Sequence, residues 1–195
     1  VDTNGNTPLI LATTYGNIEI VEFLLENQSD VNFYNYKNST ALLEASKKGY
    51  LDIVSLLVQS KADINLTDIN GNTPLILALR HRNIEVANLL IQNEADINYS
   101  NDDNITPLIE ASKKGYLEVV ELLLKKQENK NIEEINTALI LSSKKGYKDV
   151  VDLLVKNGAD LNFTDEYGNT PLIIALNNNH KELLELLIKK INSFD

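Results

Sequence analysis

Basic side chains recur along this 195-residue chain at a regular spacing. Four adjacent pairs, separated by 33, 33 and 31 residues, are Lys47-Lys48, Arg80-His81, Lys113-Lys114 and Lys144-Lys145. Positively charged groups gathered on one surface attract negative charge and raise the rate at which an acidic ligand associates. The chemistry that this pattern offers is therefore the binding of carboxylates or other anionic groups.

The groups needed for catalysis or metal binding are sparse. The chain has two histidines, His81 and His180, and no cysteine. It contains no Cys/His cluster or His-Glu-x-x-His stretch for a transition metal, and no glycine-rich loop for phosphate. Residues 2–5 and 68–71 resemble the start of a calcium-binding loop, but the third ligand and the distal glutamate are missing. We predict that the protein is not an enzyme and holds no metal or cofactor.

The composition limits which classes of partner and which cellular compartment we expect. The net charge of −10 and the pI of about 4.7 argue against nucleic acid or an anionic membrane as a partner. The sequence shows no apolar run long enough to cross a membrane and no signal peptide. A chain without cysteine tolerates a reducing compartment. We expect a cytoplasmic or otherwise intracellular protein, including one that a pathogen delivers into a host cell.

Threonines reveal how the chain is organised. Six of them are followed by proline or a small residue and then by leucine. The intervals between these six are 33, 33, 33, 31 and 33 residues. The six are Thr7, Thr40, Thr73, Thr106, Thr137 and Thr170. A period of this length is typical of proteins that stack one small unit, in which function lies on a surface shared by several units.

One period, residues 68–100, predicts a pair of helices. Residues 68–72 are turn-forming, Thr73 is suited to cap a helix and Pro74 to occupy its first position. A short apolar helix follows, and after a break a second helix begins near Ile84. Each unit is therefore expected to read turn, short helix, tight loop, longer helix, turn.

A 33-residue unit that opens its first helix with Thr-Pro-Leu resembles the ankyrin repeat. Family marks between the helices are Gly16, Gly49, Gly115 and Gly146, and Asp-apolar-Asn endings stand at residues 30–32, 63–65, 96–98 and 160–162. The resemblance implies an all-α ankyrin-repeat solenoid of six helix-turn-helix units with short β-hairpin or turn connections. The expected single domain, 1–195, divides into 1–34, 35–67, 68–100, 101–131, 132–164 and 165–195. We expect it to be a fragment of a longer protein.

The sequence departs from the family pattern at several turns. Gln28, Lys61 and Glu94 replace a glycine, and a left-handed conformation there would cost each on the order of 1 kcal/mol. The segment 127–136 is two residues shorter than the matching segments of the other repeats, and it lacks the glycine of the hairpin. We expect this junction to be the weakest seam, with faster hydrogen exchange than the matching segment 93–105.

The resemblance also implies a binding groove lined by the hairpin tips and by the ends of the first helices. The basic pairs fall at those helix ends and would form a stripe roughly 30 Å long. Hairpin tips at 102–103, 133–134 and 166–167 would form an acidic wall ~12 Å away. Exposed tyrosines would act as contact anchors. The candidate partner-binding residues are Tyr15, Tyr36, Lys47, Lys48, Arg80, His81, Lys113, Lys114, Lys144, Lys145 and Tyr167.

We therefore expect the protein to be a non-catalytic, monomeric module. It would bind another protein through its concave face and recognise an acidic segment of that protein. Several alternatives stay open. The lysines could instead complement helix dipoles, worth about 0.3–1 kcal/mol each. The array could be the targeting arm of a larger effector or enzyme, or a structural spacer. Finally, asparagines at positions hydroxylated in ankyrin proteins could make the chain a substrate: Asn32, Asn65, Asn98 and Asn162.

Overall fold

The computed structural model describes residues 1–192, which contain twelve helices in six consecutive pairs and no strand. Two compact units, Val1–Pro107 and Leu108–Asp195, divide the chain. The helices of the first unit are α1 (Pro8–Thr14), α2 (Ile18–Glu26), α3 (Ala41–Lys48), α4 (Leu51–Gln59), α5 (Pro74–Arg80) and α6 (Ile84–Gln92). Those that follow are α7 (Pro107–Lys114), α8 (Leu117–Lys126), α9 (Ile132–Lys145), α10 (Lys148–Lys156), α11 (Pro171–Asn177) and α12 (Lys181–Ile191).

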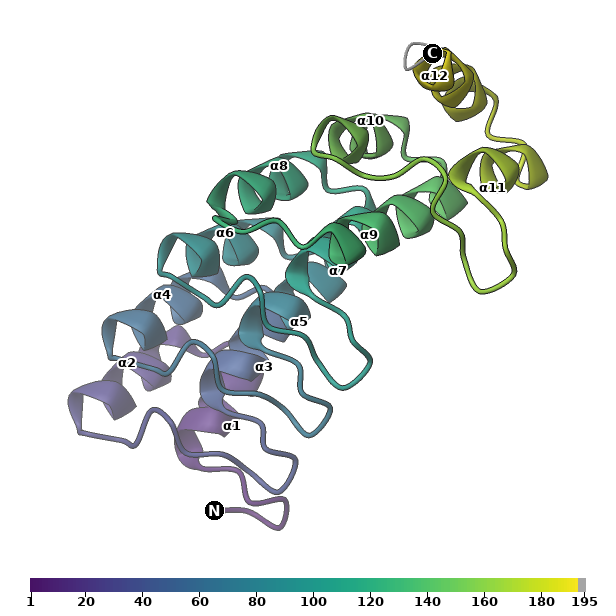
Figure 1. Cartoon of the computed structure of the whole chain (residues 1–195). Helices are drawn as coiled ribbons and strands as arrows, with labels where there is room; N and C mark the ends of the chain where they lie inside the picture. The colour runs from purple at the N-terminus through teal and green to yellow at the C-terminus, as the bar shows by residue number, and fades with distance from the viewer. Residues whose placement is uncertain (193–195) are drawn as a thin grey trace. The chain divides into compact units, whose positions relative to one another are not determined.

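Within each unit, successive helix pairs stack on one another. In the first unit, α1, α3 and α5 form one row, and α2, α4 and α6 form a second row (Figure 1). In the second unit, α9 contacts α11, and α8, α10 and α12 follow one another in the outer row. Side chains that are 0% exposed fill the space between the rows, among them Leu57, Leu90, Leu123 and Leu154. The all-α prediction is confirmed.

The helix starts are fixed by the threonines. In four repeats the threonine hydroxyl accepts a hydrogen bond from the backbone N–H three residues later, at 3.2 to 3.4 Å. These capping residues are Thr7, Thr40, Thr73 and Thr170. Such a bond satisfies one of the N–H groups that a helix leaves unpaired at its start, which confirms the predicted caps.

The predicted left-handed turns are also present. Gln28, Lys61 and Glu94 have φ values of 60°, 67° and 65°, so non-glycine residues do adopt this conformation after the second helices. Between the two helices of a pair, tyrosine rings pack on glycines of the preceding pair. A Cβ added at Gly115 would lie 2.9 Å from the ring of Tyr147, which confirms that this tyrosine is a packing residue.

Amide side chains join successive repeats. Asn35 donates to Asn6 at 2.6 Å, and Asn101 donates to Asn72 at 2.7 Å, in each case across 29 residues. A second set of bonds runs from the backbone N–H of an aspartate to the amide oxygen of an asparagine in the preceding repeat: Asp63 to Asn32 and Asp96 to Asn65. The same kind of bond runs within repeat 132–164, from Asp160 to Asn136. We call both sets the amide links. They explain why turn asparagines recur without invoking a ligand.

The junction at residues 127–136 differs from the prediction. Glu133 and Glu134 do not form an acidic hairpin tip, because α9 begins at Ile132 and includes them in its first turn. Asn131 caps this helix, and Thr137 lies within it. The sequence Asn-Ile-Glu-Glu offers a cap followed by acidic residues, which favours a helix start six residues before the usual place.

Other polar contacts take the place of the missing hairpin. Gln127 is 6% exposed, and its Nε2 donates to Oε2 of Glu134 at 3.0 Å. Asn136, within α9, accepts a bond from the backbone N–H of Asp160 near the end of the same repeat. The faster hydrogen exchange expected at this junction, relative to residues 93–105, stays a prediction. The junction does have a buried hydrogen bond of its own, between Gln127 and Glu134.

Two neighbouring serines in α9 provide a test of how buried hydroxyls affect stability. Both are 0% exposed, but Ser142 donates to the carbonyl of Ala138 at 2.8 Å, whereas the Ser143 hydroxyl has no hydrogen-bond partner among the described residues. We expect Ser143→Ala to raise the free energy of unfolding by roughly 1 kcal/mol and Ser142→Ala to lower it by a similar amount. Urea denaturation of both variants measures this, and equal losses would contradict it.

Candidate functional site

The basic residues lie where the sequence placed them, at the ends of first helices. Lys47 and Lys48 occupy the last turn of α3, and Arg80 the last turn of α5, all in the first unit. Lys113-Lys114 and Lys144-Lys145 occupy the last turns of α7 and α9 in the second unit. They therefore form one basic set in each compact unit. A single stripe running through all of them stays a prediction.

The first-unit cavity lies between α3, α5 and the hairpin that precedes α5, and has a volume of about 270 Å³. Its basic lining residues are Lys37, Lys47, Arg80 and His81. Two carboxylates also line it: Asp68 from the hairpin and Glu44 from α3, whose Oε1 accepts from the Ser39 hydroxyl at 2.7 Å. Sequence reasoning overlooked Glu44, although it stands three residues before the Lys47-Lys48 pair.

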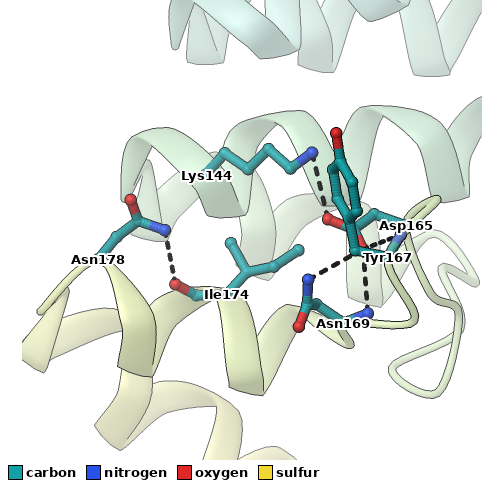
Figure 2. A network of polar contacts seen from close by, with 6 residues as sticks. All are labelled: Lys144, Asp165, Tyr167, Asn169, Ile174 and Asn178. Carbon is teal, nitrogen blue, oxygen red and sulfur yellow. Dashed lines mark hydrogen bonds and ion pairs between the residues drawn. The ribbon is translucent and has the colours of Figure 1, made fainter.

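The second-unit cavity is larger, about 430 Å³, and is lined by residues of α7, α9, α11 and the hairpin before α11. Lys113, Lys144 and Lys145 line it together with Asp165 and Tyr167. Figure 2 shows its polar network, in which Lys144 Nζ lies 3.2 Å from Asp165 Oδ2. The Asp165 side chain is only 6% exposed, so this ion pair closes one side of the cavity.

The hairpin holds Asp165 in place. Its Oδ1 accepts hydrogen bonds from the backbone N–H groups of Tyr167 and Asn169, each at 3.0 Å (Figure 2). The bond from Asn169 contributes most to lowering the pKa of the Asp165 carboxyl; burial opposes it, and the Lys144 ammonium lowers the pKa further. The net pKa lies below the ordinary value, so this carboxylate stays charged at neutral pH.

This ion pair predicts a specific acid sensitivity. Because the folded-state pKa of Asp165 lies below the unfolded value of about 3.9, its stabilising contribution is complete above that value and is lost as pH falls through the folded pKa. We expect Asp165→Asn to be less stable than wild type near neutral pH, with the difference shrinking below about pH 4. Chemical denaturation over this pH range measures it, and a difference independent of pH would contradict it.

The geometry corrects the expected composition of the groove walls. The predicted separation of ~12 Å between the hairpin tips and the lysines stays a prediction, but the hairpin residue Asp165, which the prediction left out, contacts Lys144 directly at 3.2 Å. The acidic wall is also interrupted, because residues 133–134 belong to α9. Lys114 points toward Glu110, a carboxylate that is 2% exposed, with 3.9 Å between their charged atoms. Two of the predicted binding lysines thus have internal partners.

The helix pairs match a known family of repeat proteins. The family model described as ankyrin repeats (3 copies) matches residues 1–68, 60–134 and 128–195. The chain belongs to the ankyrin-repeat family. It is similar to a chain in the solved complex of the Bd0816 predatory endopeptidase from Bdellovibrio bacteriovorus with immunity protein Bd3460. That match has 28% sequence identity and a TM-score of 0.82, and it covers 95% of this chain and 99% of the other. No curated protein sequence matches.

Ankyrin-repeat arrays are protein–protein interaction modules, so the two cavities are candidate contact sites for a partner protein. The predicted aromatic anchors of this ankyrin array are accessible: Tyr15, Tyr36 and Tyr167 are 80%, 74% and 77% exposed. Tyr36 and Tyr167 stand on hairpins, and Tyr167 lines the second-unit cavity. Tyr15 lies at the end of α1.

The histidines of the ankyrin array have separate environments. His81 lines the first-unit cavity. The Nε2 atom of His180 lies 3.2 Å from the carbonyl of Lys144, and its ring packs on Gly146, so His180 helps to end α9. Residues 1–192 contain no group of three or more potential metal-binding side chains. None of the helices described there combines the length and hydrophobicity that a membrane crossing requires.

Proposed function

We propose that this ankyrin-repeat protein is a non-catalytic, monomeric binding module that recognises an acidic segment of a partner protein. The observation that carries the proposal is the same in both units: basic residues at the ends of first helices line a cavity beside a hairpin. In either unit, the segment would lie along the first helices and insert a side chain into the cavity of that unit.

The distribution of charge supports an acidic ligand. Second helices begin with acidic residues, namely Glu19, Asp52, Glu85, Glu118, Asp149 and Glu182. First helices α3, α5, α7 and α9 instead end with basic ones. A chain with a net charge of −10 therefore has basic groups at the ends of four successive first helices, in addition to the lysines of its second helices. Such a surface steers acidic partners at a rate that falls with ionic strength.

Nucleic acid fits this surface less well than a polypeptide does. Carboxylates stand among the basic groups: Glu44 and Asp68 in the first-unit cavity and Asp165 in the second. Exposed Asp102 and Asp103 add negative charge at a hairpin tip of the first unit. A phosphate backbone carries closely spaced negative charges and would be repelled by these groups. A polypeptide can instead place single carboxylates opposite single lysines.

Fluorescence anisotropy with a labelled oligoglutamate peptide tests the proposal. We expect binding that weakens steadily as salt is added, no binding of an oligoglutamine peptide of equal length, and weaker binding of duplex DNA. Light scattering on the same sample should give a mass near 21.8 kDa if the protein is monomeric. Oligoglutamate affinity that is absent, or equal to that of oligoglutamine, would refute recognition of an acidic segment.

A second candidate function follows from the structural likeness to the endopeptidase–immunity protein complex. On this reading the chain binds a peptidase and blocks its activity. The test is to immobilise the chain, recover bound proteins from its source cells and assay them for peptidase activity. A peptidase that loses activity when one equivalent of the chain is added would establish inhibition; a bound partner without peptidase activity would exclude it.

A further inference from the structure

We infer that the second-unit cavity is the anchoring subsite for a glutamate side chain of the partner. Lys113 and Lys145 would be the cations that bind the carboxylate of this glutamate. Asp165 forms an ion pair with Lys144 and would limit the affinity of the cavity for the glutamate. The inference rests on the proposed function, because it assigns one residue of the acidic segment to one cavity.

The first argument is the charge inside each cavity. Three lysines and one carboxylate line the second-unit cavity, which leaves an excess of two positive charges: Lys113, Lys144 and Lys145 against Asp165. The first-unit cavity has Lys37, Lys47 and Arg80 against Glu44 and Asp68, which leaves an excess of one when histidine is counted as neutral, as in the net charge of the chain. The second-unit cavity therefore attracts a carboxylate more strongly.

The irregular junction explains this excess. A lysine seven residues after the repeat threonine shares its cavity with an aspartate five residues before the next threonine: Lys47 with Asp68, and Lys144 with Asp165. Lys113 stands in the same position of its repeat, but Ile132 occupies the place of the aspartate. Because α9 begins there instead of a hairpin, Lys113 has no aspartate counterpart in the next repeat.

The cavity also has apolar walls suited to a side chain with methylene groups. Leu141 of α9 and Ile174 of α11 line it, and Tyr167 stands at the hairpin with 77% of its surface exposed. Its volume of about 430 Å³ falls within the roughly 300–1,000 Å³ of small-ligand sites. Lysines act as point charges on flexible stems, so two of them can close on a carboxylate that enters beside Tyr167.

Asp165 sets the affinity because it is a carboxylate already bound to Lys144. An incoming carboxylate gains less from Lys144 and is repelled by Asp165. Asparagine at this position retains an Oδ1 that can accept the backbone N–H groups of Tyr167 and Asn169, so the hairpin is preserved while the charge is removed. The Asp165→Asn protein should therefore bind an acidic segment more tightly than wild type does.

The experiment compares four variants with wild type by anisotropy of the labelled oligoglutamate peptide at low salt. Lys113→Gln with Lys145→Gln should weaken binding about three- to tenfold, as expected for two partly solvated charge pairs. Asp165→Asn should strengthen it about two- to fivefold. The matched control, Lys148→Gln with Lys181→Gln, makes the same change in net charge at the starts of α10 and α12 and should leave affinity within about twofold.

The outcomes separate this inference from the proposed function. If the control weakens binding as much as the cavity variant, the effect is one of net charge, and the subsite is wrong. If Lys47→Gln with Arg80→Gln abolishes binding while the cavity variant does not, the acidic segment anchors in the first unit, and only the inference fails. Unchanged affinity in Asp165→Asn would overturn the role of that residue. Circular dichroism of each variant confirms that it is folded.

Discussion

We expect binding of an acidic partner to weaken by about 100-fold or more when four groove lysines are changed to glutamate. These four are Lys47, Lys48, Lys113 and Lys145. Placing like charges opposite each other across an interface costs several kcal/mol, and about 2.7 kcal/mol already corresponds to that factor. These four lysines form no ion pair in the part of the chain that the structure describes. Reversing them should therefore disturb the fold little.

Lys114 and Lys144 are left out of this variant for a structural reason. Each faces a carboxylate that is nearly inaccessible: Glu110 is 2% exposed and Asp165 6% exposed. A glutamate at either position would repel that carboxylate and lower stability, which would confuse loss of binding with loss of folding. The structure thus changes which lysines a charge-reversal experiment should use.

The control reverses four exposed lysines on second helices: Lys126, Lys148, Lys181 and Lys189. Binding is measured with oligoglutamate and with any partner recovered from cells. If the lysines serve only helix dipoles, reversing the groove set would lower the free energy of unfolding by about 0.3–1 kcal/mol per residue and leave binding unchanged. That result would refute the binding role and leave the dipole explanation.

A large effect on stability is expected from a substitution at Gly146. It ends α9 with φ of +74°, and a Cβ there would lie 2.7 Å from Nδ1 of His180. We expect Gly146→Ala to lower the free energy of unfolding by roughly 2–3 kcal/mol, of which about 1 kcal/mol is backbone strain. The remainder would come from moving His180 away from the Lys144 carbonyl.

Gly168 supplies the matched control for this substitution. Its φ is +77°, but a Cβ there would meet nothing within 4 Å. Gly168→Ala should therefore show the strain alone, about 1 kcal/mol. Urea denaturation measures both variants. Equal losses at the two positions would mean that contact with His180 does not constrain the end of α9.

The features that the sequence predicted correctly depend on a few neighbouring residues. Thr7 and Thr73 are each followed by proline and leucine, and both cap helices, so they marked true helix starts. The left-handed turn at Lys61 followed from its place in the repeat. Local hydrogen bonding and backbone sterics are sufficient to specify such elements.

The features that the sequence did not predict depend on competition or on contacts between repeats. Thr137 matched the repeat spacing, but Asn131 with two following glutamates provided an earlier cap, and the helix began there. The contact between Lys144 and Asp165 joins residues of different repeats, so it depends on how their helices pack. The available signal was an aspartate five residues before a repeat threonine, which is present at Asp2, Asp68 and Asp165.

The amide links described above determine how repeats can be added to the first unit. Asn32 and Asn65 accept the same backbone bond from the following repeat, at 2.7 and 2.9 Å. A duplicated copy of residues 35–67 would present this acceptor to its successor and this donor to its predecessor. The backbone bonds of this set would therefore be kept when a single repeat is added, through gene duplication or by engineering. The side-chain bonds from Asn35 to Asn6 and from Asn101 to Asn72 occur at alternate junctions between repeats, because Ser39 stands where Asn6 and Asn72 do, so keeping them requires that repeats be added in pairs.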